Sequence, residues 1–151
     1  MTKIETAIFT NMCMILDNAE NVLVQKRSHS NWPGITFPGG HAKAGESFVD
    51  AAIREVYEET GLVVSNLRLC GMKDWVQDDG TRYIVLLYKT TVFQGELVSS
   101  SEGEVWWTPL KDLSVMKLSD GMETILKIFC EDELSEQFVY KENGEWFEVL
   151  K

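Results

Sequence analysis

The chain has 151 residues, which suits one domain with a hydrophobic core and is too short for two of ordinary size. A formal net charge of −10 argues against binding of polymeric nucleic acid, because phosphate backbones are usually bound by basic patches. The sequence contains no apolar run of roughly 18 residues, no signal-peptide pattern and no cysteine spacing typical of a disulfide framework. We therefore expect one domain over residues 1–151, in the cytoplasm and without a membrane partner.

The first part of the chain predicts short strands separated by turns. Residues 4–16 and 22–27 are strand-like, and the sequence DNAEN forms the turn between them. The short apolar segment 35–37 comes next and leads into Pro38-Gly39-Gly40. Because glycine permits tight turns, this segment can bring its backbone close to a ligand.

The first predicted helix covers residues 47–60. Ser47 is spaced to cap its beginning, and Gly61 suits the position just past its end. The apolar stripe that we expect to face the core consists of Val49, Ile53, Val56 and Tyr57.

Three carboxylates lie on the other side of this predicted helix. At about 100° per residue, Glu55, Glu58 and Glu59 share an arc of roughly 100°, opposite the apolar stripe. Glu55 and Glu59 form a like-charge pair four residues apart, which costs a helix about 0.2–0.5 kcal/mol. A divalent cation would turn this repulsion into coordination, since magnesium favours a few carboxylates together with water and phosphate oxygens. By spacing alone, a solvated acidic face is the better explanation of the three residues.

The remaining elements are strands and a second helix. Residues 67–76, 81–93 and 104–108 are strand-like, and a helix is predicted over 121–131. Its predicted buried residues are Met122, Ile125, Leu126 and Phe129. Asn143-Gly144 predicts a hairpin over 137–150. Strands around two helices, with sheet at both chain ends, indicate an α/β (α+β) sandwich.

The glycine loop and the first helix together carry a family signature. Gly40, five residues, Glu46, seven residues and then REVYEETGL (residues 54–62) resembles the signature of the Nudix hydrolases at every defined position. The resemblance implies an α/β/α sandwich around a mixed sheet. It also implies an enzyme that hydrolyses a nucleoside diphosphate linked to another moiety, with Mg²⁺, or Mn²⁺ in its place, as the cofactor.

The resemblance further implies roles for individual residues. Glu55, Glu58 and Glu59 are expected to bind the metal ions, and the carbonyl oxygen of Gly39 to add a ligand. Arg54 is expected to orient Glu55 by a charge-assisted hydrogen bond, and Glu55 is our choice for the catalytic base. Glu46 is expected to support the junction between the loop and the helix.

Residues outside the signature are expected to complete the site. A loop acid is expected as a further metal ligand; Glu102 is preferred, and Glu104 is the alternative. Arg27, at the end of a strand, either contacts a phosphate or is simply exposed. Trp32 either stacks on a base or covers the core.

The short chain resembles the MutT-like branch, which acts on oxidised purine nucleoside triphosphates such as 8-oxo-dGTP. Asp120 supports this branch, because a carboxylate can accept hydrogen bonds from the neighbouring donors of a guanine-type base. Asp120 also suits a plain helix cap, in a capping box with Glu123. The alternatives are another (d)NTP, a dinucleoside polyphosphate or a nucleotide sugar as substrate, and a nucleotide-sensing module without activity. The expected partner is a small-molecule nucleotide, and the chain itself is expected to be a monomer or a homodimer.

Overall fold

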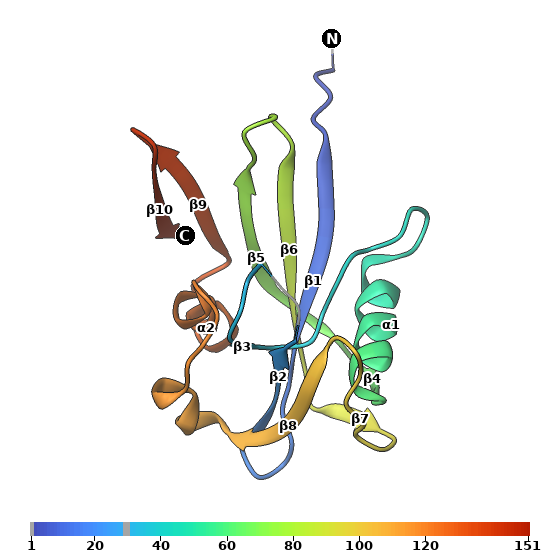
Figure 1. The fold of residues 1–151 in the computed structure, drawn as a ribbon. Coiled ribbons are helices and arrows are strands. Elements are labelled where there is room, and N and C mark those ends of the chain that lie inside the picture. Colours follow the sequence, from blue (N-terminus) through green and yellow to red (C-terminus); the bar gives the residue numbers. More distant parts are fainter. Residues whose placement is uncertain (1, 29–30) are drawn as a thin grey trace.

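The computed structural model describes residues 2–28 and 31–151. Figure 1 shows the order of the elements along the chain. The strands are β1 (Ala7–Ile15), β2 (Asn21–Arg27), β3 (Ile35–Thr36), β4 (Val63–Ser65), β5 (Arg68–Val76), β6 (Arg82–Thr90), β7 (Val92–Gln94), β8 (Gly103–Pro109), β9 (Glu136–Glu142) and β10 (Glu145–Leu150). The helices are α1 (Phe48–Thr60), the 3-10 helix η1 (Leu110–Val115) and α2 (Met122–Cys130).

The strands form one large mixed sheet and two smaller ones. The large sheet has the order β1-β6-β5-β9-β10, in which β1 is parallel to β6 and β5 is parallel to β9. The pairs β5–β6 and β9–β10 are antiparallel. A three-stranded sheet has the order β3-β2-β8, and β4 pairs with β7. The C-terminal hairpin is confirmed: Asn143 and Gly144 both have positive φ angles, of 51° and 81°, as a type I′ turn requires.

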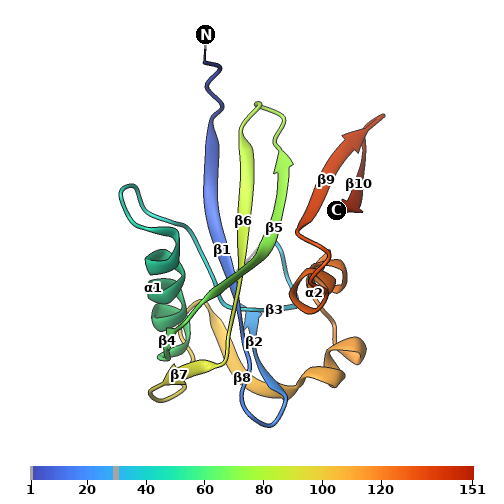
Figure 2. The same cartoon turned by 180° about the vertical axis from the view of Figure 1, so that it is seen from behind.

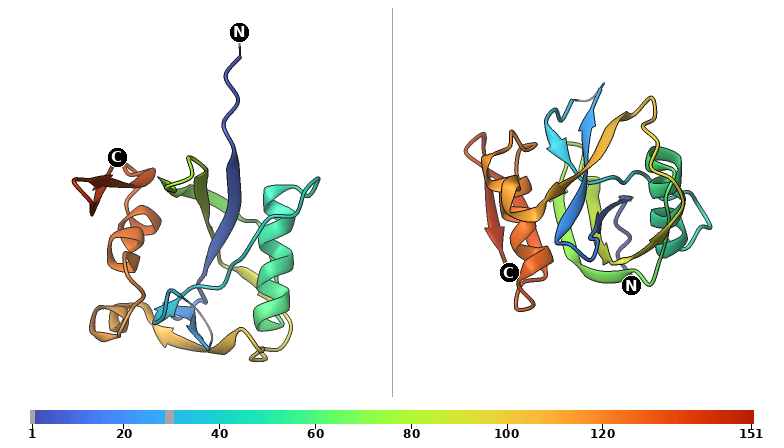
Figure 3. Two further views of the ribbon diagram at one scale, coloured as in Figure 1. Left: turned by 45° about the horizontal axis from the view of Figure 1, so that its top comes forward. Right: turned by 90° about the horizontal axis from the view of Figure 1, so that it is seen from below.

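Helices α1 and α2 lie on opposite sides of the large sheet, as the views in Figures 2 and 3 show. Strand β1 contributes to both layers of the core because alternate side chains point to opposite faces. Met12 and Met14 join the cluster that includes α2, whereas Cys13 and Ile15 join the cluster that includes α1. The predicted α/β (α+β) sandwich with a mixed sheet is therefore confirmed.

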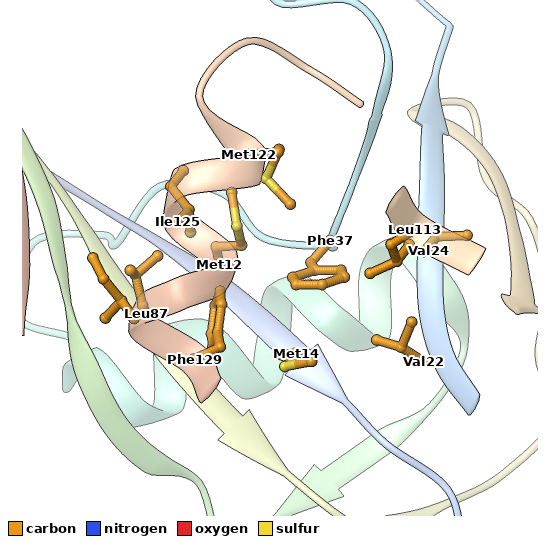
Figure 4. Close-up of a cluster of buried hydrophobic side chains, with 11 residues drawn as sticks. Met12, Met14, Val22, Val24, Phe37, Leu87, Leu113, Met122, Ile125 and Phe129 are labelled. Carbon is orange, nitrogen blue, oxygen red and sulfur yellow. The ribbon is translucent and has the colours of Figure 1, made fainter. Parts of the chain in front are cut away.

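The cluster beneath α2 fixes the segment that precedes the glycine loop. Phe37 packs edge-on against Phe129 of α2, with the ring centroids 5.5 Å apart. Figure 4 shows Phe37 among side chains from β1, β2 and α2. Burying these side chains anchors the chain immediately before Pro38, so the loop that follows has a fixed starting point.

The predicted core face of the first helix is wrong in part. Val56 is fully buried, but Val49 and Tyr57 are 40% and 57% exposed. The helix instead turns toward the sheet with residues that the prediction did not place there, namely Ala51, Ala52, Glu59 and Thr60. The small alanine side chains let α1 approach the sheet closely, which brings Glu59 into the interior.

The predicted cap of the last helix is also wrong. Helix α2 begins at Met122, and its N-cap is Gly121 in the left-handed conformation, with no side-chain capping bond. Asp120 lies one residue too early, and Met122 donates its amide hydrogen to the carbonyl oxygen of Ser119. The capping box of Asp120 with Glu123 therefore does not form. Of the residues predicted to be buried on this helix, Met122, Ile125 and Phe129 are buried. Leu126 is only partly buried, and Ile128 is buried instead.

Other differences concern element ends. The first strand begins at Ala7 rather than at residue 4, and the strand predicted over 81–93 is divided into β6 and β7. Strand β4 and the 3-10 helix were not predicted. Among the described residues no helix is both long and apolar enough to cross a bilayer.

Candidate active site

The glycine loop is held against the free edge of β1. The Asn11 amide donates to the carbonyl oxygen of Gly40 at 2.8 Å, and the Cys13 amide donates to that of Pro38 at 2.9 Å. A Cβ atom at Gly39 would lie 2.0 Å from the carbonyl oxygen of Asn11, so only glycine permits this approach. A Cβ atom at Gly40 would lie 2.4 Å from the carboxyl group of Glu55. The loop therefore passes directly between β1 and the acidic helix.

Helix α1 begins where the sequence predicts. The Ser47 hydroxyl accepts a hydrogen bond from the Asp50 amide, and Gly61 ends the helix with a φ of 78°. These two boundaries fix the length of the helix and the position of each carboxylate along it.

Arg54 connects the loop to the carboxylates of α1. Its guanidinium group donates to both carboxylate oxygens of Glu46, at 2.8 and 3.0 Å, and to the carbonyl oxygen of His41. It also donates to Glu55 at 3.0 Å and to Glu58 at 3.2 Å. The hydrogen bonds from Arg54 lower the pKa of Glu46 to about 2. Arg54 is thus placed to orient Glu55, and Glu46 supports the junction of loop and helix.

The three carboxylates of the helix differ in their surroundings. The side chain of Glu58 is 51% exposed and that of Glu55 is 15% exposed. Glu59, taken as a whole residue, is only 3% exposed. The expectation that Glu59 points away from the core is therefore wrong. Its Oε2 accepts a hydrogen bond of 3.0 Å from the Gly39 amide. Burial raises the pKa of Glu59 to about 7, although the Gly39 hydrogen bond and the charge of Arg27 act in the opposite direction.

The donor set of this region suits a divalent cation that prefers oxygen. Three carboxylates of one helix and the carbonyl groups of a glycine loop are hard ligands of the kind that magnesium binds. The desolvated Glu59 would be stabilised by a cation beside it, since burial without a full counter-charge is costly. In the described part of the chain, no three acidic, histidine or cysteine side chains are already gathered around one point. Arg54 instead holds Glu55 and Glu58, and Gly39 holds Glu59.

A cavity of about 230 Å³ opens beside the glycine loop. Its lining includes Gly39, Gly40 and Arg27, each of which lies close to a carboxylate of the acidic helix. The remaining lining includes a lysine and four large aromatic side chains, which are Lys73, Trp32, Phe37, Trp75 and Tyr83. The rings of Trp75 and Tyr83 are stacked, with their centroids 4.5 Å apart. Aromatic side chains thus share the lining of the cavity with the glycine backbone and two cationic side chains, Arg27 and Lys73.

Arg27, which lines the cavity, lies next to the loop of Glu102. Arg27 ends β2 opposite Gly103 of β8, and the Ser28 amide donates to the carbonyl oxygen of Glu102 at 3.2 Å. Glu102 and Glu104 are both exposed, and Glu104 pairs in register with Lys26. The backbone of Glu102 is therefore tied to the segment that follows Arg27.

Asp120 lies beside the aromatic part of the cavity. Its carbonyl oxygen accepts a hydrogen bond of 2.8 Å from the indole of Trp32. Asp120 is exposed, and its charge acts on Lys73 by raising the pKa of that lysine. Trp32 both lines the cavity and packs against the core, so the two interpretations of this residue are compatible.

Sequence reasoning did not find Lys73, Trp75, Tyr83 or Asn11 as residues of this region. Lys73 and Trp75 alternate on β5, Tyr83 faces Trp75 from β6, and Asn11 lies on β1. Period-two alternation along residues 67–76 would have placed Lys73 and Trp75 on one face. It would not have indicated that this face lines a cavity.

Comparison with known proteins identifies this arrangement. Residues 9–129 match the family model of the NUDIX domain. The chain is 29% identical over 119 residues to the protein named uncharacterized Nudix hydrolase YvcI of Bacillus subtilis (strain 168), covering 76% of this chain and 73% of that protein. It is 28% identical over 116 residues to the ADP-ribose pyrophosphatase of Methanocaldococcus jannaschii, covering 75% and 68% respectively. Among solved structures, the mutator MutT protein from Bacillus halodurans superimposes with a TM-score of 0.79 at 25% identity, over 95% of this chain and 97% of that one.

Proposed function

The chain belongs to the Nudix family of pyrophosphohydrolases, and we propose that it hydrolyses an oxidised purine nucleoside triphosphate such as 8-oxo-dGTP. The products are the nucleoside monophosphate and pyrophosphate. Nudix hydrolases use divalent metal ions, and we propose Mg²⁺ here, with Mn²⁺ able to replace it.

The observation that carries this proposal is the cavity. It joins an aromatic pocket to the Gly39–Gly40 loop, which lies beside the acidic helix. A purine presents a large flat face that stacks on Trp and Tyr rings, and its phosphates would extend toward the glycine backbone and Arg27. Asp120, whose backbone carbonyl is bound by the cavity residue Trp32, supplies a carboxylate that can accept hydrogen bonds from a guanine-type edge. The lining thus offers partners for both the base and the phosphates of a purine nucleotide.

Glu55, Glu58 and Glu59 would bind the metal ions, together with the Gly39 carbonyl oxygen and Glu102 from its loop. Bound there, the ions would neutralise phosphate oxygens and lower the pKa of a coordinated water. Glu102 is preferred to Glu104 because it lies in the loop whose backbone is hydrogen-bonded to the segment after Arg27. Glu104 lies within strand β8, opposite Lys26 of β2 in the strand register.

The side chains of this protein then have separate tasks. Arg54 keeps Glu55 in one orientation, and Glu46 keeps Arg54 in place by two hydrogen bonds. Glu55 accepts the proton of the attacking water, as a carboxylate held at the glycine loop. Arg27 donates to a phosphate oxygen and so positions the reacting group for in-line attack.

A second candidate substrate is ADP-ribose. The relative from Methanocaldococcus jannaschii, at 28% identity, is named ADP-ribose pyrophosphatase. An adenine ring would use the same aromatic wall, but it offers no pair of neighbouring donors to Asp120. Another (d)NTP, a dinucleoside polyphosphate or a nucleotide sugar would also place a base there. A sensing module without activity is disfavoured, because every carboxylate of the signature is retained.

The test is a substrate panel with product identification. The purified protein with Mg²⁺ is supplied with 8-oxo-dGTP, dGTP, dATP, dCTP, a dinucleoside polyphosphate, a nucleotide sugar and ADP-ribose, and products are separated by ion-exchange chromatography. We expect the highest kcat/KM for 8-oxo-dGTP, with pyrophosphate as the second product. A higher kcat/KM for ADP-ribose would transfer the assignment to the second candidate.

A further inference from the structure

We propose that Lys73 determines the specificity of the cavity, by donating a hydrogen bond to the 6-carbonyl oxygen of a guanine-type base. The inference rests on the proposed function and deepens it. It assigns the purine preference to a lysine–carboxylate pair formed by Lys73 and Asp120.

Lys73 extends from β5 into the cavity between two indole rings. Its Nζ lies 5.3 Å from the ring centroid of Trp32 and 5.6 Å from that of Trp75. Two aromatic faces hold the ammonium group in place by cation–π attraction, which requires no hydrogen-bond acceptor. Gly121 leaves room for it, since a Cβ atom there would lie 3.3 Å from Nζ.

The amino group of Lys73 is partly buried and has no direct polar partner among the described residues. None of the hydrogen bonds or ion pairs found among residues 2–28 and 31–151 involves Nζ of Lys73. Burial lowers the pKa of Lys73, and the nearby carboxylates of Glu148 and Asp120 act in the opposite direction. A cavity-lining cation with unused donors is suited to a ligand that brings an acceptor.

The neighbouring acid Glu148 is already bound. Its carboxylate accepts hydrogen bonds from Thr124 at 2.5 Å and from Gln137 at 2.9 Å. Among the described residues, no such hydrogen bond or ion pair engages the carboxylate of Asp120, which is exposed beside Trp32. Of the two acids near Lys73, Asp120 is therefore the one whose carboxylate has no hydrogen bond among the described residues.

A cation next to a free carboxylate matches one purine edge and opposes the other. Guanine-type bases present the O6 acceptor beside the N1–H and N2–H₂ donors, so O6 faces Lys73 while the donors face Asp120. Adenine presents an amino donor at position 6 and an acceptor at N1, which reverses both interactions. The pair therefore selects 6-oxopurines against 6-aminopurines, because adenine sets its amino donor against the ammonium group and its N1 acceptor against the carboxylate.

The test replaces the cation while keeping its apolar stem. Lys73→Met is compared with the wild-type protein for 8-oxo-dGTP, dGTP and inosine triphosphate, and for dATP as the 6-aminopurine. We expect kcat/KM for the three 6-oxopurine nucleotides to fall about 10- to 100-fold, as for loss of a charged hydrogen bond. The value for dATP should not fall, because the cation opposes the amino group of adenine. Lys141→Met is the matched control, since Lys141 also lies over an indole, 5.4 Å from the Trp146 centroid, and does not line the cavity.

Equal losses for all four nucleotides, or no loss for any, would overturn the inference. A second readout keeps it separate from the proposed hydrolysis. Binding of GMP and of AMP is followed in chelator by the fluorescence of the cavity tryptophans. We expect the wild type to prefer GMP, Lys73→Met to lose this preference, and Lys73→Arg to keep part of it. Failure of every triphosphate to react would refute the proposed function, whereas absence of the GMP preference would refute the role of Lys73.

Discussion

Replacement of the buried Glu59 by glutamine tests the electrostatics of the site directly. Burial raises the pKa of Glu59 from 4.5 to about 7, so the metal-free fold favours the neutral carboxyl group. The stability contributed by this group is fully present below pH 4.5 and is lost as the pH rises through about 7. Glutamine is neutral at every pH, and its side-chain oxygen can still accept the hydrogen bond from Gly39.

The size of the effect follows from the pKa shift. At about 1.4 kcal/mol per pKa unit, ionisation of Glu59 costs the metal-free fold about 3 kcal/mol at pH 8 and less than about 1 kcal/mol at pH 5. We therefore expect Glu59→Gln to gain about 2 kcal/mol relative to wild type between these two pH values. For a chain of this size, that difference corresponds to about 4–8 °C in Tm.

The assay is urea unfolding of both proteins in chelator at pH 5 and pH 8. Glu133→Gln is the control, because it makes the same charge change on an exposed side chain and should show no such gain. Added Mg²⁺ should stabilise the wild type against unfolding and have little effect on the stability of Glu59→Gln. The kcat of Glu59→Gln should also fall by orders of magnitude. A stability difference that is the same at both pH values would refute the buried, partly uncompensated carboxylate.

Three further substitutions test the rest of the site. In a magnesium titration of turnover, Glu102→Gln should weaken activation more than Glu104→Gln does, because the Glu102 loop is hydrogen-bonded to the segment after Arg27. The reverse ranking would assign the metal-binding role to Glu104. Asp120→Ala should lower kcat/KM for 8-oxo-dGTP roughly 5- to 150-fold and for dCTP much less, with little change in Tm because Asp120 caps no helix. Equal losses on both nucleotides would remove Asp120 from base recognition. Arg54→Lys should lower kcat about 10- to 100-fold, since lysine cannot donate to Glu55 and Glu58 while also bridging to the loop. Unchanged turnover would show that Arg54 has no positioning role.

Local signals in the sequence predicted the frame of the site well. The boundaries of α1 follow from Ser47 and Gly61, whose capping geometry depends on a few neighbouring residues only. The C-terminal hairpin follows for the same reason from Asn143-Gly144. The connection of Arg54 to Glu55 was also expected, and the structure contains it.

Features that depend on packing between distant segments were not predicted. The rotation of α1 was misjudged because Ala51 and Ala52 carry little weight in an apolar pattern, although small side chains decide which face approaches a sheet most closely. The environment of Glu59 follows from that rotation. The cavity combines side chains of β1, β2, β5 and β6 with the glycine loop, and no sequence period relates these segments. The N-cap of α2 was predicted one residue too early. Gly121, in the left-handed conformation, occupies the N-cap position that the prediction gave to Asp120.

The central claim is that the acidic face of α1, beside the Gly39–Gly40 loop, carries out metal-dependent hydrolysis. It is tested most directly by measuring pyrophosphate release from 8-oxo-dGTP as Mg²⁺ is titrated into metal-free protein, for wild type, Glu55→Gln and the control Glu133→Gln. We predict no turnover in chelator, saturable activation of the wild type and the control by Mg²⁺, and a loss of several orders of magnitude in kcat for Glu55→Gln. Full turnover in chelator, or a Glu55→Gln variant as active as the control, would contradict the claim.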